Sequence, residues 1–597
     1  GLRLRVYAPV GELVPGMAYL VRRLLENTSN ESFVRRRFVE GRSLDELVSA
    51  PSVAALPEPQ PPTRRAPTDP SAPGPYRHEP LAEWRRPGVR AAMAAAVEAA
   101  AGRLGRRVPA LVDGRPVDPG PAIESVDPAD PGTVVASVAS CGGREGQAAM
   151  AAARRGGPGW RRTPVRERAA VLFRAAEWMR ERRMELAALE VFEAGKPWAD
   201  ADGDVCEAID YCEYYGREAL RLDEGGRVES PPGEVNRLGY EPRGIAAVIA
   251  PWNFPLAIPT GMTTAALVTG NPVLLKPAEQ APAVAACLAE ALHASGLPPG
   301  VLAFLPGTGE EMGAWLVEHP DVAVIAFTGS KAVGLAITAS AAVHRPGQRH
   351  VKRVIVEMGG KNPLIVDADA DLDQAVPAIV VSAFGYAGQK CSAASRLVVL
   401  DAIHDELMER LVGATMELRI GHPRQGSVHM GPVIEREARE RLQRAIEDAP
   451  RHGRVVLSRS DVPARGFFVG PTIVDDVDPR SPLATEELFG PVLAVLRAPT
   501  FAAAVELANR TDYALTAGVL SRSPANIRLA ASGLRAGNVY VNRPTTGAVV
   551  GRQPFGGYGL SGVGSKAGGP DYLLEFVNPR VVTENTLRQG FAPLDDQ

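Results

Sequence analysis

The chain has 597 residues, of which 45% are hydrophobic and 23% are charged, and its 66 basic and 69 acidic residues give a formal net charge of -3. A single core rarely grows beyond roughly 250–300 residues, so we expect several domains. The balanced charge argues against a nucleic-acid-binding protein, and five cysteines without a CxxC pair argue against a disulfide framework or a structural zinc site. This cysteine usage is typical of a reducing compartment, and we expect a cytoplasmic protein.

Residues 1–50 predict a strand, a turn and two short helices, which are too little to bury a core alone. The chain begins at Gly1 without a methionine, within an apolar pattern, so we interpret it as a piece of something longer. Residues 51–88 are rich in proline and predict an extended, poorly packed linker. An alanine-rich helix is predicted over residues 89–102, and no apolar run reaches the roughly 18 residues of a membrane span.

Between residues 243 and 360, apolar strand-like runs alternate with helical stretches. The runs are residues 245–250, 272–276, 301–305, 322–327 and 351–357. This alternation predicts a mostly parallel, doubly wound sheet, which binds nucleotides at the carboxyl ends of its strands. Residues 362–554 predict a second α/β domain, and the polar segments 225–242 and 575–586 predict hairpin or edge strands, possible sites of oligomer contact.

Three residues could take part in catalysis, and two more could bind a cofactor. Cys391 lies between small residues in FGYAGQKCSAAS, although most isolated cysteines are simply buried in the core. Asn253 in PWNFP follows a buried strand, where its amide could donate to a developing oxyanion or merely form a turn. Glu357 ends a strand at a double glycine, where a carboxylate can be a general base or a surface salt bridge. Lys276 and Glu279 in KPAE follow another apolar strand and could hold ribose hydroxyls.

Seven segments resemble, in order, those of the aldehyde dehydrogenase superfamily: PWNFP, KPAE, FTGSKAVG, EMGGKN, GQKCSA, EELFGPV and PFGGYGLSG. The resemblance covers roughly residues 105–585. The ending GSKAGGPDYL, with Ser392 directly after Cys391, resembles the L-glutamate γ-semialdehyde (pyrroline-5-carboxylate) dehydrogenase branch. Residues 1–50 resemble the end of a proline dehydrogenase barrel, so the whole resembles the C-terminal portion of the bifunctional proline catabolic enzymes.

The resemblance implies a mechanism in which Cys391 attacks the aldehyde as a thiolate, while Asn253 and the Cys391 backbone N–H hold the oxyanion. Glu357 would activate the water that hydrolyses the thioester. The implied cofactor is NAD, and a carboxylate at Glu279 favours it over NADP because it would repel a 2′-phosphate. The implied cofactor-binding residues are Trp252, Lys276, Glu279, Gly307, Gly329, Ser330, Glu487 and Phe489.

The resemblance also implies how a semialdehyde bearing an α-amino acid would be held. Ser392 and the backbone N–H groups of Gly568 and Gly569 would anchor the carboxylate, since glycine lets the backbone approach a ligand. Phe254 and Phe576 would flank the aliphatic stem, although by themselves they are equally consistent with ordinary core residues.

In the N-terminal segment, Tyr19, Arg22 and Arg23 match the proline dehydrogenase helix that grips the proline carboxylate, or form a solvated basic face. The strands that would hold FAD are absent from this sequence, so we expect no proline oxidation by this chain alone. We expect no metal, since the few histidines show no ligand spacing with an acidic partner.

The expected fold is α/β and aldehyde dehydrogenase-like, in a homo-oligomer that binds a small-molecule substrate and no nucleic acid. The longer bifunctional protein would associate with a membrane through its proline dehydrogenase half. Three alternatives are a dehydrogenase for another aldehyde, a silent scaffold that should have lost a catalytic residue, and a DNA-binding regulator, for which no module is visible. The expected regions are a proline dehydrogenase remnant (1–50), a linker (51–88), N-terminal helices and an NAD-binding domain (89–360) with a hairpin (225–242), a catalytic domain (361–560), and a substrate anchor loop with a C-terminal oligomerisation strand (561–597).

Overall fold

The computed structural model describes Met17, Val21, Arg37, residues 41–43 and residues 67–587. The chain divides into two units, Gly1–Ala66 and Pro67–Gln597. The strand and helices predicted for residues 1–50, with Tyr19, Arg22 and Arg23, fall mostly outside the described residues. No helix of the described part is long and apolar enough to cross a membrane.

An eight-stranded sheet contains the five predicted strands, and they run parallel to one another as expected. Each strand lies within two residues of its predicted bounds. The strands are β7 (Ile245–Ile249), β8 (Val273–Lys276), β9 (Leu302–Phe304), β10 (Val322–Thr328) and β11 (Arg353–Glu357). Three short strands, which the sequence analysis missed, extend the sheet by antiparallel pairing: β2 (Ala110–Val112), β3 (Arg115–Val117) and β21 (Gly562–Val563).

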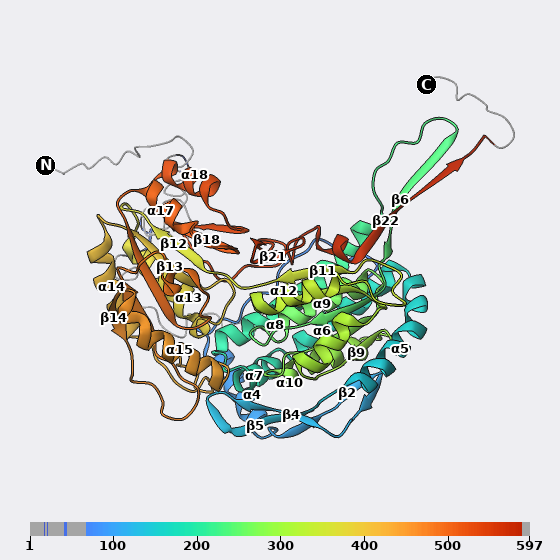
Figure 1. Cartoon of the computed structure of the whole chain (residues 1–597), viewed down its shortest axis with the longest axis horizontal. Helices are drawn as coiled ribbons and strands as arrows, with labels where there is room; N and C mark the ends of the chain where they lie inside the picture. The colour runs from blue at the N-terminus through green and yellow to red at the C-terminus, as the bar shows by residue number, and fades with distance from the viewer. Residues whose placement is uncertain (1–16, 18–20, 22–36, 38–40, 44–66, 588–597) are drawn as a thin grey trace. The chain divides into compact units, whose positions relative to one another are not determined.

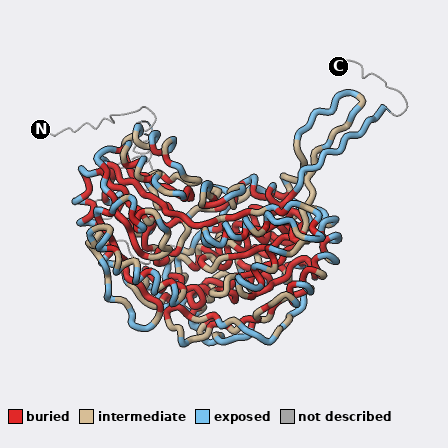
Figure 2. The backbone as a smooth tube through the Cα atoms, in the orientation of Figure 1, coloured by how far each residue is buried: buried red, intermediate tan, exposed pale blue. Residues whose placement is uncertain are grey.

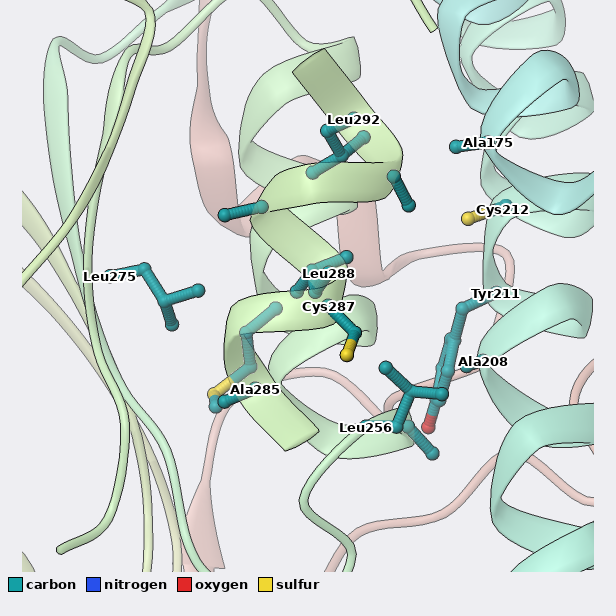
Figure 3. Close-up of a cluster of buried hydrophobic side chains, with 14 of the residues drawn as sticks. Ala175, Ala208, Tyr211, Cys212, Leu256, Leu275, Ala285, Cys287, Leu288 and Leu292 are labelled. Carbon is teal, nitrogen blue, oxygen red and sulfur yellow. The ribbon is translucent and has the colours of Figure 1, made fainter. Parts of the chain in front are cut away.

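Helices cover both faces of this sheet (Figure 1). They are α4 (Pro87–Ala101), α5 (Gly143–Arg162), α6 (Val165–Glu181), α7 (Arg183–Glu193), α8 (Trp198–Asp223), α9 (Ala257–Val268), α10 (Pro282–Ala294), η2 (Gly309–Gly313), α11 (Ala314–Glu318) and α12 (Lys331–Ala341). Successive residues of β8 point to opposite faces of the sheet and therefore enter separate cores. Leu275 packs in the cluster under α8 and α10 (Figure 3), and Leu274 packs in the cluster under α5. Burial on both faces explains why these strands are continuous apolar runs.

A seven-stranded sheet forms the second α/β layer system, in the order β14-β15-β16-β13-β12-β18-β19, with all neighbours parallel except β14. Its strands are β12 (Asn362–Val366), β13 (Ala394–Leu400), β14 (Arg454–Ser458), β15 (Thr472–Asp475), β16 (Val492–Ala498), β18 (Thr516–Leu520) and β19 (Asn538–Val541). Its helices and turns are α13 (Leu372–Phe384), η3 (Gly385–Gly388), α14 (His404–Met416), α15 (Arg436–Asp448), η4 (Ala449–Arg451), α16 (Pro482–Thr485), α17 (Phe501–Ala508) and α18 (Pro524–Gly533). The turn η5 (Tyr572–Phe576) instead packs against α8 and α9, and its buried side chains join the core of the first sheet. Buried residues concentrate in the strands of both sheets (Figure 2).

Three smaller sheets complete the fold. The polar segments 225–242 and 575–586 supply β6 (Glu234–Pro242) and β22 (Val577–Asn585), which pair with each other along their whole length in a ribbon that extends from the sheets (Figure 1). The sequence alone cannot reveal this pairing, because more than 300 residues separate the partners. The others are β1 (Arg106–Val108) with β4 (Ala122–Asp127) and β5 (Asp130–Ala139), and β17 (Tyr513–Ala514) with β20 (Tyr558–Gly559).

Residues 67–86, which belong to the predicted linker, run along helix α8. Their backbone N–H groups donate to acidic side chains of the helix: Glu79 to Asp210 at 2.7 Å and Ala82 to Asp202 at 2.8 Å. This part of the chain is therefore extended, as expected, but it is anchored rather than poorly packed.

Candidate active site

The carboxyl ends of the parallel strands bring four of the segments singled out in the sequence to one edge of the sheet. Register pairs Thr328 at the end of β10 with Glu357 at the end of β11, and Ile249 at the end of β7 with Lys276 at the end of β8. The PWNFP segment follows β7 directly, and FTGS spans the end of β10. The topology therefore gathers segments that lie far apart in the sequence, as expected for a doubly wound sheet.

Cys391 lies in a turn between η3 and β13, and contacts from several elements fix that turn. The preceding Tyr386 and Ala387 have φ of 52° and 54°, a conformation that non-glycine residues rarely adopt. The Lys390 ammonium pairs with Asp200 at 2.6 Å, and the Asn362 amide donates to the Cys391 carbonyl at 2.7 Å. The nucleophile loop is thus held by α8 on one side and β12 on the other.

Two cavities meet at the Cys391 side chain. The first has a volume of about 270 Å³ and the second about 110 Å³, and both are also lined by Ile258, Thr328 and Met358. The first contains the expected cofactor residues Trp252, Gly329, Ser330, Glu487 and Phe489, with Asn253. The second contains Glu357, Phe254 and Ser392 among the expected residues, with Glu207, Tyr211, Phe555 and Tyr572.

Burial raises the pKa of the Cys391 thiol to about 12, with further contributions from the negative charges of Glu357 and Glu487. The thiol is therefore protonated at neutral pH in this structure, and its proton must leave as the sulfur attacks. The other four cysteines are buried, whereas Cys391 is half-exposed toward the cavities. Among the cysteines, Cys391 is the one that lines both cavities.

Glu357 ends β11 with its carboxylate turned to the smaller cavity. Its Oε2 accepts from the Gly557 N–H at 3.4 Å, and its buried Oε1 has no hydrogen-bond partner among the described residues. Burial raises the pKa of this carboxyl to about 8, while the Gly557 N–H and Lys566 act in the opposite direction. An unpartnered carboxylate oxygen with a pKa near neutrality suits a general base that takes a proton from water.

The Asn253 side chain is buried beside the nucleophile loop. Its Nδ2 donates to the Gln389 carbonyl at 3.2 Å, two residues before Cys391. An amide nitrogen in this place can stabilise negative charge that develops on an oxygen bound next to the sulfur.

The larger cavity carries a carboxylate and two aromatic rings. Glu487 accepts from the Gly360 N–H at 2.8 Å, and a Cβ on Gly359 would come within 1.8 Å of its Oε2. Gly359 is thus required for Glu487 to approach the backbone, whereas a Cβ on Gly360 would instead meet the Asn362 side chain at 2.5 Å. Trp252 and Phe489 meet edge to face at 5.6 Å. Aromatic walls and a carboxylate fit a nicotinamide riboside, whose ring stacks and whose ribose hydroxyls donate.

Lys276, Glu279 and Gly307 do not line either cavity at Cys391; they lie farther along the same strand edge. The buried Lys276 ammonium pairs with Glu279 at 2.9 Å, and added Cβ atoms on Gly309 and Gly313 would lie 3.9 Å from Glu279 and 3.8 Å from Lys276. A Cβ on Gly307 would clash with the Cys141 carbonyl at 2.7 Å, so this glycine serves close packing. A buried ammonium beside a carboxylate offers both a donor and acceptors for ribose hydroxyls, as the sequence analysis expects.

Three expected substrate residues do not reach the smaller cavity. The Gly568 N–H donates to the Tyr215 hydroxyl at 2.8 Å, and the Gly569 N–H donates to the Lys566 carbonyl at 3.1 Å. Phe576 is fully buried in the core, 5.5 Å from Tyr572 between ring centroids. The turn η5 brings Tyr572 to the lining of the smaller cavity, whereas Phe576, one turn later, lies in the core.

Glu207 is a cavity residue that the sequence analysis missed. It lies on α8 one turn after Asp204, and burial, followed by the charge of Asp204, raises its pKa to about 8. The available signal was a row of acidic side chains in a helix that otherwise buries most of its residues. A carboxyl group in such a cavity favours a cationic ligand.

The sequence matches the aldehyde dehydrogenase family over residues 117–582 and proline dehydrogenase over residues 1–36. It is 47% identical over 510 residues to the 1-pyrroline-5-carboxylate dehydrogenase of Geobacillus thermodenitrificans, covering 85% of this chain and 99% of that protein. The fold matches the NAD-bound 1-pyrroline-5-carboxylate dehydrogenase from Thermus with a TM-score of 0.84 and 43% identity, covering 86% of this chain and 99% of that one. It also matches proline utilization A from Bdellovibrio bacteriovorus with a TM-score of 0.87 and 48% identity, covering 99% of this chain but 61% of that protein.

Proposed function

The chain belongs to the aldehyde dehydrogenase family, and we propose that it oxidises L-glutamate γ-semialdehyde, the open form of 1-pyrroline-5-carboxylate, to L-glutamate with NAD as the electron acceptor. The observation that carries this proposal is the meeting of two cavities at Cys391, one with the features of a nicotinamide site and one with a buried carboxyl group. The similarity to 1-pyrroline-5-carboxylate dehydrogenases supports it over most of the chain.

The residues divide the oxidation into two easier steps. The Cys391 sulfur attacks the aldehyde carbon, the thiol proton passes to water, and the Asn253 amide stabilises the resulting oxyanion, a contribution of roughly 3–4 kcal/mol for such donors. Trp252, Glu487 and Phe489 of the larger cavity would hold NAD, which would supply the acceptor for the hydride of that carbon, so that an acyl thioester would remain on Cys391. Glu357 then takes a proton from water, the hydroxide oxygen attacks the thioester carbon, and the carboxylic acid departs as the thiol is restored.

The smaller cavity supplies groups for the amino acid end and the aliphatic stem of the proposed substrate. The Glu207 carboxylate would pair with the α-ammonium group, and the buried Ser392 hydroxyl would donate to the α-carboxylate. The Phe254 ring would lie along the aliphatic stem. Because Gly568 and Gly569 use their N–H groups within the protein in this structure, their proposed anchoring of the carboxylate requires those bonds to be exchanged.

The proposal is tested by NADH formation with L-glutamate γ-semialdehyde and with propanal, each offered with NAD and with NADP. We expect the semialdehyde to have the higher kcat/KM and NAD to exceed NADP, since Glu279 would repel a 2′-phosphate. Equal use of propanal would overturn the substrate assignment and leave an aldehyde dehydrogenase of another kind. Faster reaction with NADP would overturn the role given to Glu279.

Replacing Glu207 by glutamine should raise the KM for the semialdehyde by about 10-fold to 100-fold, because a charge-assisted hydrogen bond to the ammonium group is lost. The KM for NAD should stay unchanged, since Glu207 does not line the larger cavity. Glutarate semialdehyde lacks the amino group, and its KM should not rise in the variant. An equal rise for both aldehydes would show that Glu207 shapes the cavity without reading the ammonium group.

We also propose that the β6–β22 ribbon is a contact between copies of this chain. Val581 and Val582 are 60% and 48% exposed on opposite faces of the ribbon, so each face offers an apolar side chain to a second copy. Val581→Glu should therefore shift the protein toward the monomer in light scattering, whereas Thr583→Ser should not. A wild-type monomer at micromolar concentration would rule out this contact.

A further inference from the structure

The carboxylate of Glu357 is held by the backbone of Gly556 and Gly557. The Gly557 N–H donates to Oε2 at 3.4 Å, and a Cβ on Gly556 would lie 2.8 Å from Oε1. Gly562, which pairs with Glu357 across β21 and β11, would place its own Cβ 3.0 Å from Oε2. The orientation of the proposed general base therefore depends on where this glycine-rich backbone lies.

Lys566 fixes that backbone from its other side. Its ammonium donates to the Gly556 carbonyl at 3.1 Å, to the Asn538 side-chain oxygen at 3.0 Å, and to the Gly537 carbonyl. The Asn538 amide in turn donates to the Pro554 carbonyl at 2.9 Å. The segment that holds Glu357 is thus tied to β19 through one ammonium group and one amide.

The Lys566 charge has no carboxylate within ion-pair distance among the described residues, and its three acceptors are neutral oxygens. It borders an open groove of about 570 Å³ whose lining contains no acidic side chain. The groove is lined by Asn538, Val539, Tyr540, Val541, Arg543, Gln553, Pro554 and Lys566. The carboxyl that its charge affects is Glu357, behind the Gly556–Gly557 backbone.

We propose that Lys566 is a positioning residue for the general base: it clamps the Gly556–Gly557 backbone against Glu357, and its positive charge favours the ionised carboxylate. This inference rests on the proposed function and adds to it a residue that touches neither substrate nor cofactor. The other titratable groups that interact with Glu357 are the Cys391 thiol and the Tyr572 hydroxyl, both neutral near pH 7, so Lys566 is the cation that bears on it.

The role is visible in a pH profile because Lys566 lowers the pKa of Glu357, against the larger effect of burial. Removing the cation should therefore raise that pKa. Since the base acts only when it is ionised, the acidic limb of the pH profile of kcat, where kcat rises with pH, should move to higher pH. A lysine that merely stabilised the fold would not move the limb.

The experiment compares Lys566→Met, Lys566→Arg and the wild type in steady-state and rapid-mixing NADH formation across pH. In Lys566→Met we expect kcat to fall by roughly 10-fold to 100-fold, the cost typical of a displaced catalytic group. The rapid first turnover of NADH should persist, because it precedes thioester hydrolysis. Lys566→Arg should restore the position of the acidic limb, since it keeps the charge.

Two further variants keep the test decisive. Lys566→Gln retains amide donors for the carbonyls and removes only the charge. It should therefore shift the acidic limb of the pH profile with a smaller fall in kcat, and it replaces Lys566→Met if that variant does not fold.

Lys352→Met is the matched control, because Lys352 also donates to two backbone carbonyls, those of Val317 and His319, but away from the site. The acidic limb of the pH profile of this variant should match that of the wild type.

An unchanged limb in both Lys566→Met and Lys566→Gln would overturn the inference. So would a fall in the first turnover equal to the fall in kcat, because the base would then not be the affected group. These outcomes differ from failure of the proposed function, in which the wild type itself would not oxidise the semialdehyde.

Discussion

Cys391→Ala should lower kcat for NADH formation from any aldehyde by roughly 10⁴-fold or more, the scale at which loss of a covalent nucleophile is felt. Cys391 is the cysteine at the junction of the two cavities, and the other four are buried within the described fold. No other cysteine can therefore take over attack on the carbonyl carbon. The measurement is the absorbance of NADH with L-glutamate γ-semialdehyde under saturating NAD.

The matched control is Cys287→Ala, which removes a thiol from the core between α10 and α8 (Figure 3). It should lose some thermal stability and keep its kcat. NAD binding to Cys391→Ala, measured by calorimetry, should be close to that of the wild type, because the Trp252–Phe489 wall and Glu487 remain. Substantial turnover by Cys391→Ala would mean that the oxidation proceeds without a thioester.

Glu357→Gln should block the second half of the reaction. We expect one rapid turnover of NADH per site, followed by a steady state about 10²-fold to 10⁴-fold slower, the usual range for loss of a general base. The amide cannot take a proton from water, so the thioester persists. Rapid-mixing kinetics measure the first turnover, and mass spectrometry of the quenched protein should find the acyl group on Cys391.

The pH dependence has a definite sign. The folded-state pKa of Glu357, about 8, lies above the ordinary glutamate value, so the ionised base is present above that pH and is lost as pH falls through it. Wild-type kcat should rise with pH through this region, and Glu357→Gln should lack the limb. Glu185→Gln, on α7 in an exposed ion pair with Arg103, is the control and should match the wild type. Loss of the first turnover in Glu357→Gln would assign this residue to attack instead of hydrolysis.

The strands of the first sheet could be predicted because they are short apolar runs, such as Val273–Lys276, bounded by proline or glycine and buried on both faces. The strands that were missed are different in kind. β2, β3 and β21 have two or three residues each, too few to show a periodic pattern. β21 pairs with β11 and β2 pairs with β9 over long distances in the sequence, whereas β2 and β3 form a local hairpin across Asp113 and Gly114, a turn signal that the sequence analysis overlooked.

The residues of the site divide in the same way, into those that a local sequence pattern predicts and those that only the folded chain brings to the cavity. Cys391, Asn253 and Glu357 stand out in the sequence because each follows or ends an element that carries its own signal. Glu207 lies within a continuous helix, and only the packing of α8 against the PWNFP segment turns it toward the cavity. The direction of the Gly568 N–H depends on a φ of 68° and on the Tyr215 hydroxyl, neither of which a sequence pattern specifies.

The pairing of β21 with β11, and of β22 with β6, has a consequence for biosynthesis. A ribosome makes β11 about 200 residues before β21 and makes β6 more than 300 residues before β22, so both earlier strands wait with an unpaired edge. Exposed strand edges promote aggregation during such an interval. The nascent chain can bury its first core early, but Glu357, the proposed general base, acquires its final surroundings only after residues 556–562 have emerged.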